Sequence, residues 1–283
     1  MAINWYPGHI AKAERKLKEQ VKLVDVVFEV LDARIPLSSL YENVGALLSN
    51  KPRLVLLNKS DVADPESNVK WLKYLEETTN LKVIMTSATS GKDISSVIKE
   101  AIDLGKPEIE KLIAKGRLAR PIRAMVVGMP NVGKSSIINK LIKAAKVKVG
   151  AKAGVTRTAQ WIRINPKLEL LDTPGIIPMK LSSQERAFKL AVVNSIGEAA
   201  YDKIEVANVL ISMVYERYPQ LFCEYYKLKC QESPTIEEIA IARNLLLTAG
   251  KPDIDRCASL VLTDFRQGRI GRITLEDTPQ IQN

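Results

Sequence analysis

The segment Gly128–Ser135, with the sequence Gly-Met-Pro-Asn-Val-Gly-Lys-Ser, has the residue types and spacing of a phosphate-binding loop. Gly128 and Gly133 allow the backbone to turn its N–H groups toward phosphate oxygens. The Lys134 ammonium can reach the β- and γ-phosphates, and the Ser135 hydroxyl can bind magnesium. We therefore predict Lys134 as a catalytic residue, within a phosphate site made by Asn131, Val132, Gly133, Lys134, Ser135 and Ser136.

A second motif, Asn58-Lys59-Ser60-Asp61, predicts which base is bound. The Asp61 carboxylate can accept hydrogen bonds from N1–H and the 2-amino group of guanine, and adenine offers no such pair of donors. A site built for those donors rejects analogues that lack them by roughly 10⁴-fold. The segment Thr86-Ser87-Ala88 follows the next expected strand, where GTPases usually place a backbone N–H on guanine O6. The expected ligand is therefore GTP or GDP.

A third motif, Asp172-Thr173-Pro174-Gly175, suits a magnesium-linked carboxylate followed by a glycine whose N–H meets the γ-phosphate. The polar stretch Gly154–Thr158 lies between the phosphate loop and this motif, where a first switch segment is expected. Thr156 is our candidate for contacts to magnesium and the γ-phosphate, and Thr158 is the alternative. The predicted magnesium ligands are thus Ser135, Thr156 and Asp172, and Gly175 joins the nucleotide-binding residues.

The order of these motifs is unusual, because the base-reading motif at Asn58–Asp61 precedes the phosphate loop at Gly128–Ser135. Ras-like GTPases have the phosphate loop first and the base-reading motif last. Rotating the sequence and opening the chain elsewhere converts one order into the other. As a consequence, the segment after Gly175 leads directly into a C-terminal region instead of the middle of the fold.

Apolar runs that end at these motifs predict buried strands, and helical patterns lie between them. Strands are expected at Val24–Leu31, Leu54–Leu57, Val83–Met85, Ile122–Val127, Gln160–Ile164 and Glu169–Leu171. Helices are expected at Ala11–Lys22, Ser38–Ser49, Glu66–Thr78, Asp93–Leu104 and Lys134–Ala145, with a charged linking stretch at Gly105–Arg120. This alternation predicts a mostly parallel α/β sheet with helices on both faces and ligands at the carboxyl ends of its strands.

We expect residues 1–178 to form a circularly permuted Ras-like P-loop GTPase domain. Residues 179–283 are expected to form a small all-helical domain. Ser182-x-x-Glu185 and Thr235-x-x-Glu238 are predicted capping boxes at helix starts, and Gly250-Lys251-Pro252 is a predicted turn.

The charge of the chain is +10 and is unevenly placed. Residues 1–177 hold 29 Lys and Arg against 18 Asp and Glu, whereas residues 178–283 hold 13 against 14. Such a basic surface favours RNA by counterion release, although a single charge run is often only a solvated face. Three clusters are candidates for RNA contact: Lys140–Lys152; Arg117, Arg120 and Arg123; and Arg266, Arg269 and Arg272.

Other features favour a cytoplasmic protein without a membrane segment, and we expect it to be monomeric. No apolar run is long enough to span a bilayer, and no signal-peptide pattern is present. Cys223, Cys230 and Cys257 lack metal-ligand spacing and are expected to be buried, reduced thiols.

With these motifs the chain resembles the circularly permuted GTPases of the ribosome biogenesis GTPase A type, over nearly its whole length. The resemblance rests on the motif order, on Asn-Trp-Tyr-Pro-Gly-His at Asn4–His9, on Leu-Asp-Ala-Arg-Ile-Pro at Leu31–Pro36, and on the basic ending Asp264–Gly271. The family usually has Trp-Phe-Pro-Gly-His-Met at its N-terminus, so Tyr6 and Ile10 are mild departures. The resemblance implies an assembly factor that binds the RNA of the large ribosomal subunit and is stimulated by the ribosome. It also implies that the helical domain at residues 179–283 binds RNA or the ribosome.

The resemblance also implies a catalytic role for His9, the single histidine of the chain. Ras-like enzymes have a glutamine that orients the attacking water at the position where this chain has Ile176, which has no hydrogen-bonding group. An imidazole can orient water or accept a proton near neutral pH. A structural role for this histidine is the alternative.

In related GTPases an asparagine at the position of Asn131 helps to hold a potassium ion beside the phosphates. Such a charge can do part of an arginine finger's work in the transition state. We therefore expect potassium as a cofactor with Asn131 as its ligand, and turn geometry is the alternative reason for this asparagine.

These observations favour a GTP hydrolase that acts as a switch in assembly of the large ribosomal subunit. It would bind the precursor subunit and its rRNA in a GTP-dependent way and leave after hydrolysis. One alternative is an RNA-binding scaffold with a structural nucleotide, which Ile176 would support. Another is a signalling GTPase directed at a protein partner.

Overall fold

The computed structural model describes residues 8–41, 44–87, 91, 93–144, 160–172, 174–176, 183–229 and 231–280. These residues divide into two compact units. The sheet unit contains residues 8–61 and 68–176, and the helical unit contains residues 62–67 and 183–280. Among the described residues, no helix is both long enough and apolar enough to cross a membrane.

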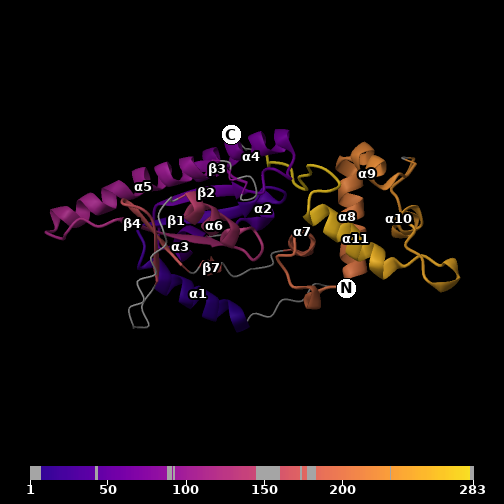
Figure 1. Ribbon diagram of the computed structural model, residues 1–283, viewed down its shortest axis with the longest axis horizontal. Helices are drawn as coiled ribbons and strands as arrows, with labels where there is room; N and C mark the ends of the chain where they lie inside the picture. The colour runs from indigo at the N-terminus through magenta and orange to yellow at the C-terminus, as the bar shows by residue number, and fades with distance from the viewer. Residues whose placement is uncertain are drawn as a thin grey trace. The chain divides into compact units, whose positions relative to one another are not determined.

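The sheet unit is built on a seven-stranded sheet in the order β3-β2-β1-β4-β6-β5, with the short β7 also paired to β4 (Figure 1). Its strands are β1 Val26–Asp32, β2 Arg53–Asn58, β3 Val83–Met85, β4 Ile122–Gly128, β5 Trp161–Asn165, β6 Leu168–Leu171 and β7 Gly175–Ile176. Only the β5–β6 pair among them is antiparallel. Strand β1 therefore lies between β2, which ends in the base-reading motif, and β4, which ends in the phosphate loop.

Helices cover both faces of this sheet, as expected for a mostly parallel sheet. The helices that lie wholly or mainly in the unit are α1 Gly8–Val21, α2 Pro36–Ser39, α3 Val44–Leu47, α4 Pro65–Thr79, α5 Ile94–Ala114 and α6 Lys134–Ala144. Helix α5 packs along β1, β2, β4 and β6, and α6 packs on β4 and β5. On the other face, Leu17 and Val21 of α1 share a buried cluster with Val27, Met125 and Val127. The predicted α/β fold is confirmed.

Three helix predictions differ from the structure. The expected linker Gly105–Arg120 is helical as far as Ala114, although Pro107 lies inside the helix. Close packing explains why the helix continues through this stretch. Gly105 lies so close to β4 that a Cβ atom on residue 105 would be 2.5 Å from Cγ2 of the buried Ile122. Helix α1 begins at Gly8, three residues before the expected start, and the single helix expected at Ser38–Ser49 is instead the short α2 and α3.

The helical unit consists of helices joined by short turns. Its α-helices are α7 Gln184–Val192, α8 Lys203–Arg217, α9 Pro219–Tyr226, α10 Ile236–Ala242 and α11 Ile254–Arg266. Helix α11 packs against α8 and α10, and Figure 1 shows α8 and α11 crossing each other. Short 3₁₀ turns lie at Glu198–Ala200 and Thr248–Gly250.

One of the two predicted capping boxes is confirmed. The Thr235 hydroxyl accepts from the Glu238 N–H, and the Glu238 carboxylate accepts from the Thr235 N–H. The other prediction is wrong, because Ser183 and not Ser182 caps α7 by accepting from the Arg186 N–H at 3.1 Å. The residue three after Ser183 is Arg186 and not a glutamate, so the capping-box pattern indicated a start one residue too early.

The segment Val62–Ser67 belongs to the helical unit, whereas the sequence assigned all of residues 1–178 to one domain. The segment pairs with the extended stretch after α11: Val62 O accepts from the Ile273 N–H at 3.1 Å, and the Asp64 N–H donates to Thr274 Oγ1 at 3.1 Å. A sequence boundary is a single cut, so it could not show that six residues from the middle of the chain complete the C-terminal unit.

The cysteines differ from one another in oxidation state. Cys257 is a buried free thiol, and burial raises its pKa to about 11. Cys223 is disulfide-bonded, so the expectation of reduced thiols is wrong for this residue. Spacing along the chain does not show whether two Cβ atoms come within bonding reach, which only the backbone path decides. Cys230 lies outside the described residues.

Candidate functional site

The predicted motifs meet at the carboxyl ends of β2, β1 and β4. In the strand register Asp32 lies opposite Asn58, Val30 lies opposite Gly128, and Val127 lies opposite Gly175. The base-reading motif, the phosphate loop and the Asp172–Gly175 turn therefore share one edge of the sheet. This edge is where ligands bind in open α/β sheets.

The phosphate loop has the backbone that its glycines suggested. Gly128 has φ +155° and Gly133 has φ +101°, and Asn131 is left-handed at φ +58°. A Cβ at Gly128 would lie 2.6 Å from the Val30 carbonyl oxygen, and one at Gly133 would collide with the Asn58 side chain. Both glycines are required by close approach as well as by conformation, so the loop can take this shape only with this sequence pattern.

Lys134 opens α6 directly after the loop and is buried. Its ammonium donates to the Met129 carbonyl at 2.6 Å, within the same loop. Burial lowers the pKa of Lys134 to about 8, because the charged form is poorly solvated there. The phosphates of a bound nucleotide would place negative charge next to this ammonium. Ser135 and Ser136 are exposed in the first turn of α6.

The base-reading motif is tied to its neighbours by hydrogen bonds. Asn58 is buried, and its Nδ2 donates to the Val132 carbonyl of the phosphate loop at 2.8 Å. The Ser60 hydroxyl donates to the Thr86 carbonyl at 2.9 Å. Thr86 and Ser87 are buried after β3, while Asp61 is exposed at the end of the motif. An exposed carboxylate on a braced loop is available to a ligand.

The side chain of Lys59 is held between the end of β1 and the phosphate loop. Its backbone is left-handed at φ +63°, and its ammonium donates to Asp32 Oδ2 at 2.9 Å and to the Asn131 carbonyl at 2.7 Å. Asp32 also forms a buried ion pair with Arg34, in which Arg34 Nη2 lies 2.8 Å from Asp32 Oδ2. Sequence reasoning gave Asp32 and Arg34 no role. The available signal was an acidic residue that ends a strand next to the strand ending in Asn58.

The Asp172–Gly175 turn lies beside the phosphate-loop strand. Asp172 is exposed after β6, and its N–H donates to the Gln160 carbonyl at 3.0 Å. Gly175 is buried in β7, where an added Cβ would meet Leu17 at 2.6 Å and Val127 at 2.9 Å. Helix α1 thus packs directly on the strand that continues this turn, and only a glycine fits beneath it.

Several predicted residues lie outside the described part of the structure. These are Ala88, Thr156, the alternative Thr158, and Thr173. The backbone of His9 belongs to the first turn of α1 rather than to a loop, and the backbone of Ile176 belongs to β7; the side chains of both lie outside the described set.

The residues present fit a magnesium ion that is bound together with a nucleotide. Among the described residues, no group of three or more His, Cys, Asp or Glu side chains could hold a metal on its own. Magnesium commonly combines one or two protein oxygens with substrate phosphates and water. The exposed hydroxyl of Ser135 and the exposed carboxylate of Asp172 are oxygen donors of that kind.

The basic clusters are partly used within the protein. Arg120 makes two hydrogen bonds to Asp25, Arg266 donates to the carbonyls of Ala191 and Val192, and Arg272 donates to that of Ala63. Arg269 pairs with Asp264, and Arg123 lies over the ring of Trp161.

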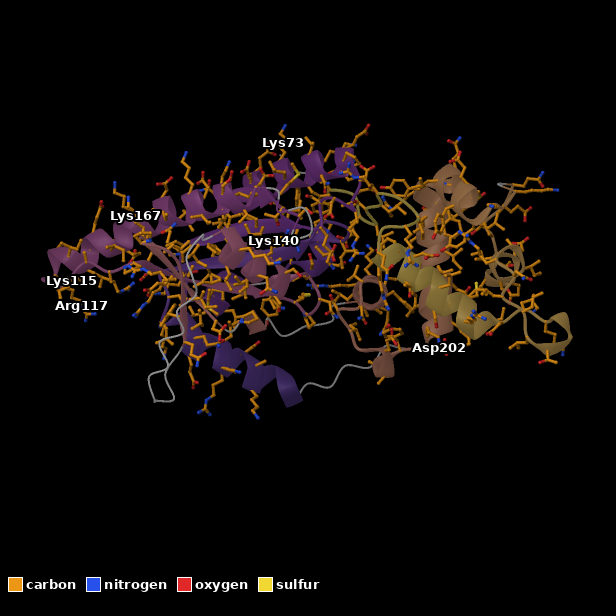
Figure 2. The ribbon with its side chains drawn as sticks, in the orientation of Figure 1. Lys73, Lys115, Arg117, Lys140, Lys167 and Asp202 are labelled. Atoms are coloured by element: carbon orange, nitrogen blue, oxygen red, sulfur yellow. The ribbon has the colours of Figure 1, made fainter. Side chains whose placement is uncertain are left out.

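Other basic side chains face solvent in the described structure. Lys115 and Arg117 are exposed where α5 ends, and Figure 2 shows both at that tip. Lys143 is exposed near the end of α6, and Lys167 is exposed in the turn between β5 and β6. The candidates for polyanion contact therefore shift from the paired arginines toward these exposed residues of the sheet unit.

Comparison with known proteins finds relatives that match nearly the whole chain. The sequence model of the 50S ribosome-binding GTPase family matches residues 123–240. A protein of Bacillus cereus named ribosome biogenesis GTPase A is 38% identical over 283 residues, which is 99% of this chain and 95% of that protein. The crystal structure of GNP-bound YlqF from T. maritima is 31% identical with a TM-score of 0.66, covering 95% of this chain and 100% of that one. The GDP-bound structure of TM YlqF is 30% identical, also with a TM-score of 0.66, and covers 93% and 99%.

Proposed function

The chain belongs to the ribosome biogenesis GTPase A family, and from this premise we propose that it binds the precursor of the large ribosomal subunit in its GTP form and leaves after hydrolysis. The observation that carries the proposal is the meeting of three nucleotide motifs at one sheet edge, two of which lead along the chain into the helical unit. GTPase activity and a part in ribosome biogenesis follow from the family. The rRNA contact, the GTP dependence and the release are the proposal.

Separate motifs would bind the base and the phosphates of the nucleotide. Asp61 would accept from the N1–H and 2-amino groups of guanine, and the buried Asn58 would keep the base-reading loop tied to the phosphate loop. Lys134 would move from the Met129 carbonyl to the β- and γ-phosphates. Ser135, Asp172 and Thr156 would hold magnesium, which when bound neutralises phosphate charge.

Potassium is a further proposed cofactor with Asn131 as a ligand. Asn131 is exposed and left-handed, a conformation that asparagine tolerates better than most residues, and its carbonyl already accepts from Lys59. Replacing potassium by sodium should slow hydrolysis if the side chain binds the ion, and Asn131→Ala should remove the difference between the salts. Equal rates in both salts for the parent protein would take potassium out of the mechanism.

His9 is the proposed residue that orients the attacking water in place of the missing glutamine. Its helix α1 packs through Leu17 on Gly175, so the element that carries the imidazole is in contact with the strand after the Asp172–Gly175 turn. Ile176 cannot orient water, so hydrolysis by the protein alone should be slow. Binding to the ribosomal particle would then bring the imidazole into position.

Co-sedimentation with precursor large subunits, in the presence of GDP and of a non-hydrolysable GTP analogue, tests the proposal. GTP turnover is measured in parallel with and without the subunits. We expect binding mainly with the GTP analogue, stimulation of turnover by the particle, and weaker binding at high salt because rRNA contacts release counterions. Equal binding in both nucleotide states would contradict the switch. Turnover that the subunit does not change would favour a scaffold with a structural nucleotide. The monomeric state and the cytoplasmic location remain part of this proposal.

A further inference from the structure

Asp32 ends the strand that lies between the two main nucleotide motifs. It is the last residue of β1, and β1 pairs with β2 on one side and with β4 on the other. Its carboxylate is fully buried and accepts four hydrogen bonds. Three come from Arg34, through its backbone N–H, Nε and Nη2, and one comes from Lys59 Nζ.

The hydrogen bond from Lys59 differs from the three that Arg34 donates, because Lys59 also contacts the phosphate loop. The same ammonium that lies 2.9 Å from Asp32 Oδ2 lies 2.7 Å from the Asn131 carbonyl in the phosphate loop. Lys59 also adopts φ +63°, which costs a non-glycine residue free energy and persists only when contacts hold it. A lysine with a flexible four-carbon stem would otherwise have many rotamers available.

Arg34 fixes the orientation of the carboxylate. Its side chain is 1% exposed and binds both oxygens of Asp32. Burial disfavours the charge on Asp32, but the Arg34 and Lys59 cations outweigh it and hold the pKa of the carboxyl well below its ordinary range. The anion is therefore present throughout the physiological pH range, in one orientation, with Oδ2 directed at Lys59.

We propose that Asp32 is a positioning residue of the nucleotide site, which acts through Lys59 to hold the base-reading loop against the phosphate loop at the spacing that a guanine nucleotide requires. This inference rests on the proposed assignment of Asn58–Asp61 and Gly128–Ser135 as the nucleotide site. It gives the Leu31–Pro36 motif a role in nucleotide affinity. Without the carboxylate, the Asn58–Val132 hydrogen bond would still join the two loops, but Lys59 would no longer be held between them, so their spacing would be set less firmly before binding.

A purely structural ion pair is the competing explanation, and a double-mutant cycle separates the two. Asp32→Asn alone would leave Arg34 buried without a counter-charge, which could unfold the protein. The cycle is therefore made in an Arg34→Met background, where Asp32 still binds Lys59. The four proteins carry neither, one or both of Asp32→Asn and Lys59→Met. Thermal unfolding establishes which of them are folded, and Arg34→Gln replaces the background if Arg34→Met is not.

The readouts are the Kd for a fluorescent GDP derivative and the KM and kcat for GTP. With Lys59 present, Asp32→Asn should weaken GDP binding by roughly 10-fold to 100-fold, the usual effect of losing a hydrogen bond to a charged group. KM should rise in parallel while kcat stays within about 3-fold, because the reacting groups are untouched. In the Lys59→Met background, Asp32→Asn should not weaken GDP binding further, because the carboxylate there has no Lys59 to position.

Two results would overturn the inference. One is an equal loss of affinity from Asp32→Asn with and without Lys59, which would mean that Asp32 does not act through Lys59. The other is a lower apparent kcat at unchanged KM, the sign of a smaller folded fraction. Failure of the parent protein itself to bind the GDP derivative would instead refute the proposed nucleotide site, so the two failures are distinguishable.

Discussion

The side chain of Asn58 shows why the nucleotide motifs depend on one another. Its Nδ2 donates to the Val132 carbonyl, and a Cβ on Gly133 would collide with the same group. An asparagine in one motif and a glycine in the other are thus required together, although 75 positions separate them in the chain. Residues that face a ligand, such as Asp61, are exposed, whereas those that connect the loops are buried.

Asp61→Asn should change the base preference of the protein. The amide offers one acceptor and one donor, so it no longer matches both donors of guanine, while xanthine presents a carbonyl at position 2. Preference for GTP over xanthosine triphosphate should fall by roughly 10⁴-fold, measured by competition for binding. If the variant binds GTP as tightly as the parent, Asp61 does not read the base.

Glu29 predicts a pH dependence of stability. It is 1% exposed, Arg53 binds its Oε2 at 2.9 Å, and its Oε1 has no hydrogen-bond partner among the described residues. Burial raises the pKa of Glu29 to about 7, against the opposing effect of Arg53. A raised carboxyl pKa stabilises the fold fully below the ordinary value of 4.5, and this contribution is lost as the pH rises through about 7.

Glu29→Gln keeps the shape of the side chain and removes this charge. We expect the variant to be more stable than the parent at pH 8 by about 1–3 kcal/mol, with the difference shrinking toward pH 5. Urea unfolding at several pH values measures it. Glu77→Gln, at an exposed position of α4, is the matched control and should show no such trend. Parallel stability curves for Glu29→Gln and the parent would contradict the assignment.

At the scale of elements, packing of α5 against β4 decided how far α5 extends. Helix α5 continues through Gly105, a lysine and Pro107, a sequence that ordinarily ends a helix. Its Gly105 is buried against Ile122 at the start of β4, so the missing side chain allows close packing. The free energy of that packing offsets the weak helix propensity of glycine and the one hydrogen bond that a proline cannot donate.

Gly105→Ala should therefore destabilise the protein, although alanine is the better helix former. The propensity gain is at most about 1 kcal/mol, and the collision with Ile122 should cost about 1–3 kcal/mol. Ser96→Ala, at an exposed position of the same helix, should instead be neutral or slightly stabilising. In an Ile122→Ala background the penalty at residue 105 should vanish. A Gly105→Ala protein more stable than the parent would show that α5 can move away from β4.

At the scale of the whole molecule, the chain passes from the sheet unit to the helical unit directly after Asp61 and again shortly after Gly175. Residues 62–67 follow Asp61, and residues 183–280 follow the strand that continues the Asp172–Gly175 turn. The helical unit thus has two covalent connections to segments expected to respond to the nucleotide. Order imposed on either motif by GTP can be passed along the chain, which is the basis of the proposed switch.

His9→Ala tests the proposed ribosome dependence of hydrolysis. The variant should bind GTP and the large subunit as the parent does, because the imidazole is proposed to act on water alone. Its stimulated turnover should fall by roughly 10²-fold to 10⁴-fold, the usual effect of a positioned acid–base group. Turnover and co-sedimentation are measured on the same preparation. Full stimulated turnover would remove His9 from catalysis, and loss of ribosome binding would make it part of the interface.

The sequence by itself determined six of the seven strands, the order of the motifs and the position of each motif at a strand end, but not the short β7. Val83–Met85 was predicted to the residue, and the strands ending at Asn58 and Gly128 were predicted within one or two positions. These features are local, because an apolar run and a glycine turn depend on neighbouring residues. The family resemblance rests on motifs of the same local kind, so the amino-acid sequence alone was enough to identify it.

Only the tertiary structure decided how the motifs are held. The role of Asp32 depends on β1 lying between β2 and β4, and the helical Gly105 depends on the Ile122 side chain. The membership of Val62–Ser67 in the helical unit depends on pairing with residues more than 200 positions later in the chain. Each of these is a contact between segments that are distant in sequence. Local propensity carries no information about such contacts, because their free energy exists only after the chain has brought the segments together.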